Sequence, residues 1–526
     1  MDATLGCELR TLMFCFLALV SCTLYWCHTC QAYHVTAWSK KYKVFRIFAS
    51  SEENVQLIHD LGHTYNLDPW RDVYRANQTG DFLVRPNYVD DVIHKLTENR
   101  IDHEIIIHDA ESFLHENTRS QRFPRDVTET FEQRYRSKYL TYPEILRFLQ
   151  YVNTSSNVNI QVGSIGKSFE GRDMPFIKIQ SNDSWPGKRT IFIDAGVHSR
   201  EWISPAMAVE IIHRLALNTE NDRAVNKLLE MFDWLIVPLV NPDGYVQTFS
   251  KGLEGRMWRK NRNKRYSTNP LCYGVDLNRN FGFQWNNSPE HGGSSNPCSG
   301  TFSGPRSFSE PETLNMGRLL LSNKDHIAGY ISFHSFGQFF LYPWGFSSDV
   351  NIEDEPDLHH VASAFVDRMK RKDYIYNLGG SAKTLYPAAG GSDDYVRGVV
   401  GVKYAYTVEL PPHENSRYGF LLPEKEVKSV VSDTWEGLKS FAFRLQQHTR
   451  ATPFNTTKFR PVTNASDQQK DLLEEVSYRT IQNALKGNFM DTLLNSMTSE
   501  KRYNRYRKSR ARTNKKIRLH LSSKTN

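Results

Sequence analysis

The stretch TIFIDAGVHSREWISPA, residues 190–206, decides the fold and raises the question of function. A strand-like apolar run, residues 190–195, breaks at Gly196, and the helix-like run AMAVEIIHRLAL follows the turn. Ser204 is expected to cap that helix and Pro205 to occupy its first position. A turn from a buried strand into a helix lies at the carboxyl edge of an open α/β sheet, where such folds bind ligands.

An imidazole and a carboxylate stand together in that turn, as His198 and Glu201. Both groups bind zinc, but a chain with 18 histidines contains roughly one His-x-x-Glu pair by chance. His108 and Glu111 repeat the pattern without a further ligand nearby, and we interpret that copy as incidental. A catalytic zinc site needs three protein ligands and one open position. His334 ends the apolar run YISFH and is expected to emerge at the same edge of the sheet as the third ligand.

Length and charge limit the number of domains and the kinds of binding partner. At 526 residues the chain has room for two or three domains. The net charge is +8, but residues 501–526 carry eleven lysines and arginines and no acid, so the basic character belongs to a tail. This tail is either an anchor for heparin-like polyanions or a solvated extension that is trimmed. No specific nucleic-acid partner is expected.

Residues 1–32 are predicted to be a secretory signal peptide. An apolar stretch, residues 11–26, precedes a small-x-small pattern that ends at Ala32. Because this stretch is shorter than the ~20 residues of a membrane span, no transmembrane segment is expected. Asp2 and Glu8 make the preceding region atypical, so a retained signal anchor is the alternative. The chain is expected to be secreted and extracellular.

Cysteine use agrees with secretion. Five of the seven cysteines lie in the first 30 residues and would leave with the signal peptide. The remaining pair, Cys272 and Cys298, is then expected to form a disulfide in an oxidising compartment. The chain also has the N-x-S/T sequons of a secreted glycoprotein, at Asn77, Asn153, Asn182, Asn286, Asn455 and Asn464.

Residues 33–105 are predicted to form a small α+β domain. Strand and helix patterns follow one another in the order βαββαβ, which matches a ferredoxin-like antiparallel sandwich. The polar connector that follows, residues 106–125, carries Arg119, Arg122 and Arg125. It is either a solvated linker or a hinge for a processing protease, because exposed basic loops are common cleavage sites.

Residues 126–447 are predicted to form an α/β domain. Apolar strands alternate with amphipathic helices, which indicates an open, doubly wound mixed sheet covered on both faces. Residues 448–526 combine a sequon-bearing linker, a weakly helical segment and the basic tail. They are expected to be largely disordered.

Six motifs follow one another along the chain: HSREW (198–202), MWRKNR (257–262), VDLNRNF (275–281), FHS (333–335), LYPAAGGSDDY (385–395) and YTVEL (406–410). Together they resemble the zinc metallocarboxypeptidases of the pancreatic A/B type, and among them the procarboxypeptidases B. Motif order and spacing match over roughly residues 33–447. The resemblance implies a zinc-dependent exopeptidase that acts on peptide and protein C-termini. It also implies a zymogen, with the N-terminal domain covering the zinc cleft.

The resemblance assigns the catalytic residues. One zinc ion per chain would be held by His198, Glu201 and His334, where it would polarise the scissile carbonyl and activate water. Glu409, after a strand, corresponds to the general base, which takes the proton of the water and delivers it to the leaving amine. Arg259 stands where the family places a cation beside the developing oxyanion.

The resemblance also assigns substrate-binding residues. Asn278 and Arg279 correspond to the clamp for the free α-carboxylate, which a guanidinium can hold through two parallel hydrogen bonds. Tyr386 resembles the mobile tyrosine that closes over the bound C-terminus, and Arg200 of HSREW is a further substrate-binding candidate. Asp276 matches a carboxylate that orients a zinc-bound histidine through its other ring nitrogen. The cysteine pair predicted above matches the family's disulfide.

Specificity depends on Asp393, because the B branch has aspartate there and the A branch an aliphatic residue. A buried carboxylate pairs with a substrate arginine or lysine and would stay unpaired beside phenylalanine. Ser381 is small and polar where the A branch has a branched aliphatic residue, whereas Asp394 is common to both branches. The prediction is therefore B-type specificity, with A-type release of hydrophobic residues as the alternative.

Two residues depart from the family pattern, and one further interpretation stays open. Phe336 replaces a tyrosine near the outer subsites, and one extra residue lies between Asp393 and the strand that carries Glu409. A catalytically silent extracellular binding protein on the same fold is the other interpretation. For the zymogen, we expect an activating protease to cleave after Arg125, where RFPR has a spaced basic pair.

Overall fold

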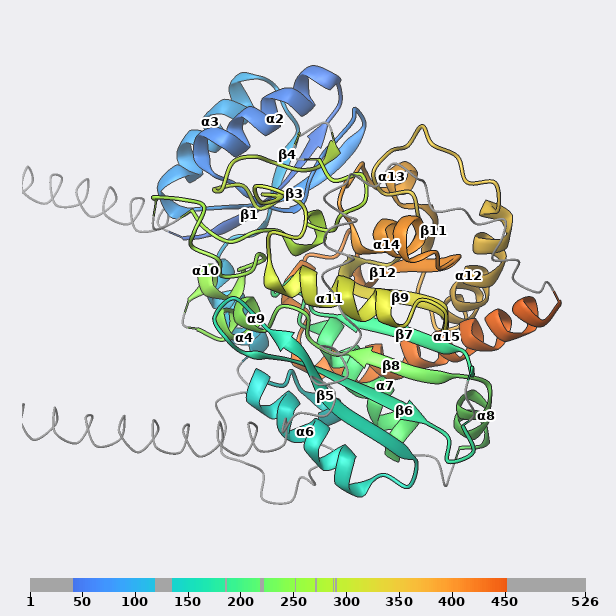
Figure 1. Cartoon of the computed structure of the whole chain (residues 1–526). Helices are drawn as coiled ribbons and strands as arrows, with labels where there is room; N and C mark the ends of the chain where they lie inside the picture. Colours follow the sequence, from blue (N-terminus) through green and yellow to red (C-terminus); the bar gives the residue numbers. More distant parts are fainter. Residues whose placement is uncertain are drawn as a thin grey trace, which may run out of the picture. The chain divides into compact units, whose positions relative to one another are not determined.

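The computed structural model describes residues 41–118, 135–184, 187–217, 222–250, 252–269, 272–286, 288 and 291–451 (Figure 1). The chain divides into two compact units, Met1–Phe123 and Pro124–Asn526. The predicted signal peptide, the arginine-bearing half of the connector and the basic tail lie outside the described residues. Among the helices of the described part, none is both long and apolar enough to cross a membrane.

The first unit is the ferredoxin-like sandwich that its sequence predicts. Its elements are β1 (Lys43–Ala49), α2 (Glu52–Tyr65), β2 (Asp68–Arg71), β3 (Gln78–Val84), η1 (Pro86–Tyr88), α3 (Val89–Glu98), β4 (His103–Ile107) and α4 (Ala110–Thr118). The strands form one antiparallel sheet in the order β2-β3-β1-β4. Apolar residues of α2 and α3, among them Ile58 and Leu96, pack against Phe45 of the central strand β1.

Helix α4 lies in the segment that the sequence predicts to be a polar connector. Its first residue, Ala110, is buried and donates its backbone N–H to the Tyr42 carbonyl at 2.9 Å. The first half of the predicted connector is therefore the end of β4 and a helix, held to the start of β1. Residues 119–125, with the proposed cleavage site, are not among those described.

The second unit contains the predicted open α/β sheet. Its strands are β5 (Asn159–Lys167), β6 (Asp173–Gln180), β7 (Thr190–Ala195), β8 (Asp233–Val237), β9 (Ile327–Gly337), β10 (Phe339–Tyr342), β11 (Asn377–Gly380) and β12 (Tyr404–His413). They lie in the order β11-β10-β12-β9-β7-β8-β6-β5. The inner strands β12, β9, β7 and β8 are parallel, whereas β10 pairs antiparallel with β12, and β6 with both β8 and β5. The sheet is mixed, as predicted.

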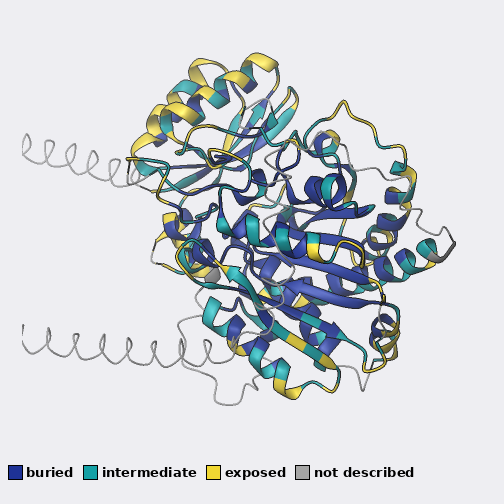
Figure 2. Cartoon of the chain, viewed as in Figure 1, coloured by how far each residue is buried: buried dark blue, intermediate teal, exposed yellow. Residues whose placement is uncertain are grey.

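Helices cover both faces of this sheet. The helices of this unit are α6 (Tyr142–Ser155), α7 (Ile203–Leu217), α8 (Arg223–Met231), α9 (Pro242–Thr248), α10 (Leu253–Arg256), η3 (Leu277–Arg279), α11 (Pro311–Ser322), α12 (Glu355–Lys370), α13 (Ser381–Thr384), α14 (Ser392–Tyr395), the π-helix η5 (Val396–Val400), η6 (Gly419–Leu421) and α15 (Glu424–Ala451). Alternate residues of β7 belong to different cores, because Ile191 and Ile193 pack with α7 and α15 whereas Phe192 packs with α11. The central strands are accordingly buried on both sides (Figure 2).

The neighbouring strands β7 and β9 are also joined by side chains. Asp194, near the carboxyl end of β7, is fully buried and pairs in register with Ser332 of β9. Its carboxylate accepts hydrogen bonds from the Tyr330 hydroxyl at 2.5 Å and the Ser332 hydroxyl at 2.7 Å. Burial raises the pKa of Asp194 to about 6, and the two hydroxyl bonds offset this only in part. This carboxyl group fixes the two strands beside the edge where the predicted ligands lie.

A pH-dependent contribution to stability follows for Asp194. Between about pH 4 and pH 6 the folded chain keeps this group protonated while the unfolded chain ionises it, so the free energy of unfolding falls as pH rises, by roughly 3 kcal/mol at most. Asp194→Asn is expected to lose this contribution. Urea unfolding of both proteins across this window measures the difference, with Asp349→Asn, an exposed aspartate, as control. A difference that is constant with pH would contradict the prediction.

Candidate active site

The turn after β7 is shaped by a glycine. Gly196 has a φ of 67°, and a Cβ atom there would lie 2.7 Å from Leu239 Cδ1, so only glycine fits without strain. The Gly196 carbonyl accepts from the backbone N–H of Asn241 at 3.0 Å. The chain therefore turns at the end of the strand and brings His198 and Glu201 to the carboxyl edge of the sheet.

Ser204 has a different role from the predicted helix cap. Helix α7 begins at Ile203, so Ser204 and Pro205 lie inside its first turn. The Ser204 hydroxyl accepts from the backbone N–H of Gly196 at 2.9 Å and donates to the carbonyl of Phe333 at 2.5 Å. The N-cap prediction is wrong, because this hydroxyl connects the turn after β7 with β9 instead of closing the helix end.

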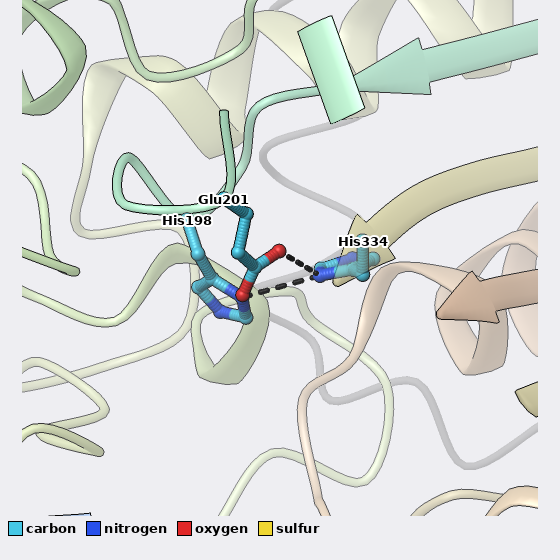
Figure 3. A group of neighbouring side chains, drawn as sticks. All are labelled: His198, Glu201 and His334. Atoms are coloured by element: carbon cyan, nitrogen blue, oxygen red, sulfur yellow. Dashed lines mark hydrogen bonds and ion pairs between the residues drawn. The ribbon is translucent and has the colours of Figure 1, made fainter. Parts of the chain in front are cut away.

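His198, Glu201 and His334 converge as the sequence predicts (Figure 3). His198 Nδ1 lies 2.8 Å from Glu201 Oε1, His334 Nδ1 lies 3.1 Å from Glu201 Oε2, and the two Nδ1 atoms are 3.1 Å apart. Two ligands of a tetrahedral zinc ion, each at about 2.1 Å, are roughly 3.4 Å apart, so the spacing fits zinc. Within the described residues this is the one group of its kind, and it does not include His108 and Glu111.

The protonation pattern of these residues also fits a cation. His198 Nε2 lies 3.0 Å from Asp276 Oδ1, and a carboxylate can only accept, so this nitrogen carries the proton. The lone pair of His198 Nδ1 then faces a Glu201 oxygen, which is also an acceptor. Burial would raise the pKa of Glu201, but the two imidazoles hold it below its usual value. Burial would lower the pKa of His334, but Glu201 raises it to about 9, so a proton lies between these groups in the metal-free chain. A metal ion could take the place of that proton and bind all three side chains.

Glu409 lies beside the metal-ligand group. Strands β12 and β9 are parallel, and their register pairs Glu409 with His334, so the two side chains lie on the same face of the sheet. Glu409 Oε2 is buried and has no hydrogen-bond partner within the described chain. Burial raises the pKa of Glu409 to about 8 in the metal-free chain, and a nearby cation would lower it. This geometry leaves a carboxylate oxygen free to exchange a proton.

Arg259 is held by the carboxylate that also fixes His198. Its Nε and Nη2 donate to Asp276 Oδ2 at 3.1 and 2.9 Å, and its Nη1 lies 3.8 Å from Glu201 Oε1. Burial would lower the pKa of Arg259, but the two carboxylates outweigh it, so the guanidinium stays charged. A permanent positive charge therefore lies next to the metal-ligand group.

The predicted carboxylate clamp is built on η3. Arg279 is buried and uses Nε and Nη1 on the carbonyls of Gly292 and Asn278, at 2.7 and 3.0 Å. The amide oxygen of Asn278 accepts from the backbone N–H of Ser392 at 3.0 Å, which leaves its amide nitrogen to donate. The ring of Tyr386 lies near the guanidinium, 6.0 Å from its carbon.

Asp393 and Asp394 are buried next to each other at the start of α14. Asp393 accepts from the Asp394 backbone N–H at 3.0 Å and from the Ser381 hydroxyl at 3.3 Å, and burial raises its pKa. Asp394 accepts from the backbone N–H groups of Gly345 and Phe346, both at 2.8 Å, so it fixes the backbone of residues 345–346. Neither carboxylate forms a salt bridge with a lysine or arginine of the described chain.

Arg200 lies in a separate cluster. Its guanidinium carbon is 4.1 Å from the centre of the Phe420 ring, and that ring packs edge-on against Phe336 at 4.9 Å. Buried Arg256 donates to the carbonyls of Arg200 and Phe420, at 2.7 and 2.6 Å. Sequence reasoning missed Arg256 and Phe420, and no local pattern marks them, because their partners lie far away in the chain.

The segment between Asp393 and strand β12, where the sequence predicts one extra residue, contains a π-helix. Residues Val396–Val400 form η5, and the backbone N–H of Gly401 closes the wide turn onto the carbonyl of Val396. A π-turn takes up more residues than an α-turn, so an insertion can be absorbed there. Strand β12 follows with continuous pairing to β9 from Tyr404 to Leu410, which includes Glu409.

The predicted disulfide is present between Cys272 and Cys298. It joins the segment before Asp276 to the loop that follows the clamp. The ammonium group of Lys260 holds the same loop, because it donates to the carbonyls of Pro297 and Ser299 at 2.6 and 2.8 Å. The loops that carry Arg259 and Arg279 are therefore crosslinked to each other.

Two family models match the chain. Residues 145–437, more than half of the chain, match the model described as zinc carboxypeptidase. Residues 45–117 match the model described as carboxypeptidase activation peptide. The second match covers the ferredoxin-like unit from β1 into α4.

Named relatives agree with these matches. Carboxypeptidase B from Astacus astacus is 38% identical over 307 residues, which cover 58% of this chain and 96% of that protein. Carboxypeptidase B from Canis lupus familiaris is 33% identical over 411 residues, 77% of this chain and 94% of that protein. The solved structure of carboxypeptidase A from Helicoverpa armigera matches with a TM-score of 0.69 at 28% identity, over 78% of this chain and 99% of that one. Since both B and A names occur, these likenesses leave the specificity open.

Ser204→Ala tests how the ligand geometry is held. The change leaves the Gly196 N–H and the Phe333 carbonyl without a partner in the buried interior, so it is expected to cost about 1–3 kcal/mol of stability. Because the hydroxyl connects the turn of His198 with the strand of His334, we also expect roughly tenfold weaker zinc binding. Urea unfolding and competition with a zinc chelator measure the two effects. Ser429→Ala, on the exposed side of α15, is the control, and unchanged zinc affinity in Ser204→Ala would contradict the prediction.

Proposed function

The chain belongs to the zinc carboxypeptidase family and carries its activation peptide, and we propose that its active form releases C-terminal arginine and lysine from peptides and proteins. It is a zinc-dependent carboxypeptidase made as a zymogen, and enzymes of this kind act on peptide C-termini. The preference for basic residues and the individual residue roles below are our proposal.

The observation that carries the specificity is the unpaired carboxylate of Asp393. It is 5% exposed, and its neighbours Ser381 and the Asp394 N–H are neutral donors. A buried anion without a cation is costly, and a substrate guanidinium or ammonium group would remove that cost. A substrate phenylalanine would bury the carboxylate further without a partner. This asymmetry favours arginine and lysine at the substrate C-terminus.

The contacts of Asn278 support this assignment. Asn278 accepts from the backbone N–H of Ser392, the residue next to Asp393. If Asn278 and Arg279 bind the α-carboxylate of a substrate, the side chain of its C-terminal residue would therefore lie near Asp393. Carboxylate recognition and side-chain recognition are one connected site, as an exopeptidase needs.

The catalytic roles follow from charge and position. His198, Glu201 and His334 would hold one zinc ion per chain, which would supply a Lewis acid for the scissile carbonyl and lower the pKa of bound water. Glu409 takes the proton from the attacking water and returns it to the leaving amine. Arg259 places its fixed positive charge where negative charge develops on the carbonyl oxygen.

Further residues position a metal ligand or the substrate. Asp276 keeps His198 in the tautomer whose Nδ1 can bind a metal. Tyr386, beside the clamp, closes over the bound C-terminus and excludes water. Arg200 and the aromatic pair Phe336 and Phe420 contact the residues that precede the scissile bond, where the missing hydroxyl of Phe336 leaves an apolar surface.

Secretion, activation and tail binding are proposals from sequence alone. The signal peptide, residues 1–32, would direct the chain out of the cell, and a protease would cleave near Arg125 to separate the activation domain from residues 126–447. The basic tail within 448–526 would bind heparin-like polyanions, with salt-sensitive retention on heparin as the test. All three segments lie outside the described residues.

Paired peptides ending in arginine or phenylalanine test the specificity. Protein cleaved at the connector is expected to release arginine and not phenylalanine, and Asp393→Ile is expected to lower kcat/KM for the arginine peptide about 100-fold while raising it for phenylalanine. Asp349→Asn serves as the control. Preference for phenylalanine in the unaltered protein would show A-type specificity. Release of neither residue by zinc-loaded protein would favour the silent binding protein.

Glu409→Gln tests the proton transfer. Glutamine keeps the shape but cannot accept the proton of water, so kcat is expected to fall by about 100-fold or more. Zinc content should stay at one ion per chain, because Glu409 is not among the three ligands. Removal of zinc by a chelator should abolish activity in the unaltered protein, and added zinc should restore it. Near-normal kcat in Glu409→Gln would assign the base to another group.

A further inference from the structure

We propose that the amino-terminal turn of α11, through Glu310, Glu312 and Thr313, positions the two substrate-facing arginines, Arg259 and Arg279. This inference rests on the proposed function of those arginines. None of the three residues contacts the metal ligands, so they act through other side chains. They belong to the SFSEPET segment, residues 307–313, outside the six family motifs, whereas the asparagines they bind lie inside two of those motifs.

The first connection runs to Arg259 through Asn261. The amide nitrogen of Asn261 donates to Glu310 Oε2 at 2.6 Å and to Glu312 Oε2 at 3.1 Å. The amide oxygen of Asn261 accepts from the backbone N–H of Val275 at 2.8 Å. Asn261 is two residues from Arg259, and Val275 precedes Asp276, the carboxylate that holds Arg259.

The two carboxylates decide which way this amide points. A carboxylate can only accept hydrogen bonds, so the nitrogen end of Asn261 must face Glu310 and Glu312. The oxygen end is then left for the Val275 N–H. If the amide turned over, its oxygen would face two carboxylate oxygens and its nitrogen would face an N–H group. The acidic pair therefore fixes the alignment of the two loop segments that meet at Arg259.

The second connection runs to Arg279 through Asn280. The amide oxygen of Asn280 accepts from the Thr313 hydroxyl at 2.7 Å and from the backbone N–H of Glu310 at 3.3 Å. Its amide nitrogen donates to the carbonyls of Ser303 and Arg306, at 2.9 and 3.0 Å. Asn280 directly follows Arg279, so the same helical turn fixes the backbone of the carboxylate clamp.

The arrangement costs free energy of folding, which indicates that these residues do more than fill space in the core. Glu310, Glu312, Asn261 and Asn280 are fully buried, and within the described chain no lysine or arginine forms a salt bridge with either glutamate. Burial raises the pKa of Glu312 to about 7, and the neighbouring charge of Glu310 adds to the effect. Two buried carboxylates without a cation destabilise a fold, and apolar residues could fill the same space.

Two substitutions separate the two connections. Glu312→Gln keeps the size but brings an amide N–H toward Asn261, because its oxygen still accepts from the Phe169 N–H. We expect kcat to fall about tenfold or more with little change in KM, since Arg259 acts on the transition state. Thr313→Val removes the hydroxyl that holds Asn280, so we expect KM to rise several-fold with a smaller effect on kcat.

The control is Leu319→Ala, a core truncation in the same helix that touches neither asparagine. It should lower stability and leave kcat and KM of the folded, zinc-loaded enzyme unchanged. If kcat and KM are also unchanged in folded Glu312→Gln and Thr313→Val, the proposal is overturned, and the first turn of α11 has a purely structural role. If Glu312→Gln does not fold, the KM of Thr313→Val alone tests the proposal. An unaltered enzyme that releases no C-terminal residue would instead refute the proposed function.

Discussion

The arrangement of the site depends on one buried carboxylate, Asp276. Its Oδ1 receives the Nε2 proton of His198 and the backbone N–H of Asn278, and its Oδ2 receives the guanidinium of Arg259. One group therefore sets the tautomer of His198, the position of Arg259, which we propose lies beside the reacting carbonyl, and the start of the proposed carboxylate clamp. Burial would raise the pKa of Asp276, but the charges of Arg259 and His198 hold it well below its usual range. Because it stays ionised, all three connections persist together.

Glu409 and Asp393, two other carboxylates of the site, differ from Asp276 in having no fixed cation. Glu409 keeps an oxygen without a partner, and Asp393 is surrounded by neutral donors. Both have a pKa raised by burial. In a purely structural core such groups would be replaced by apolar ones, because each costs free energy. In the function proposed above, this cost becomes useful when a transient partner arrives, which would be a proton of water for Glu409 and a substrate cation for Asp393.

The sheet and its edge could be predicted from sequence, but the connections between loops could not. Apolar alternation and the break at Gly196 place His198 and His334 at one strand edge, because parallel strands end on the same side. Ser204 fits every local rule for a helix cap, yet its hydroxyl bonds to Phe333, 129 residues away. Arg256 likewise binds the carbonyl of Phe420, and no periodicity reports a contact at that separation. Helix α4 was missed because its polar composition resembles a linker more than a docked helix.

The loops between 257 and 280 explain why so many polar side chains are buried around this site. Apart from the short helix η3, the described residues of these loops have no regular secondary structure, so only scattered main-chain hydrogen bonds hold them, such as that from the Gly274 N–H to the Asn263 carbonyl at 2.8 Å. The side chains of Asn261, Asn280 and Asp276 add to these bonds by accepting from or donating to main-chain groups of neighbouring segments. The disulfide adds a covalent limit on the same region. Strand β9 fixes His334, and the turn that leaves β7 carries His198 and Glu201, whereas the arginines on these loops depend on individual side chains. For that reason we expect a single amide or carboxylate far from the metal-ligand group to affect how well the substrate is held.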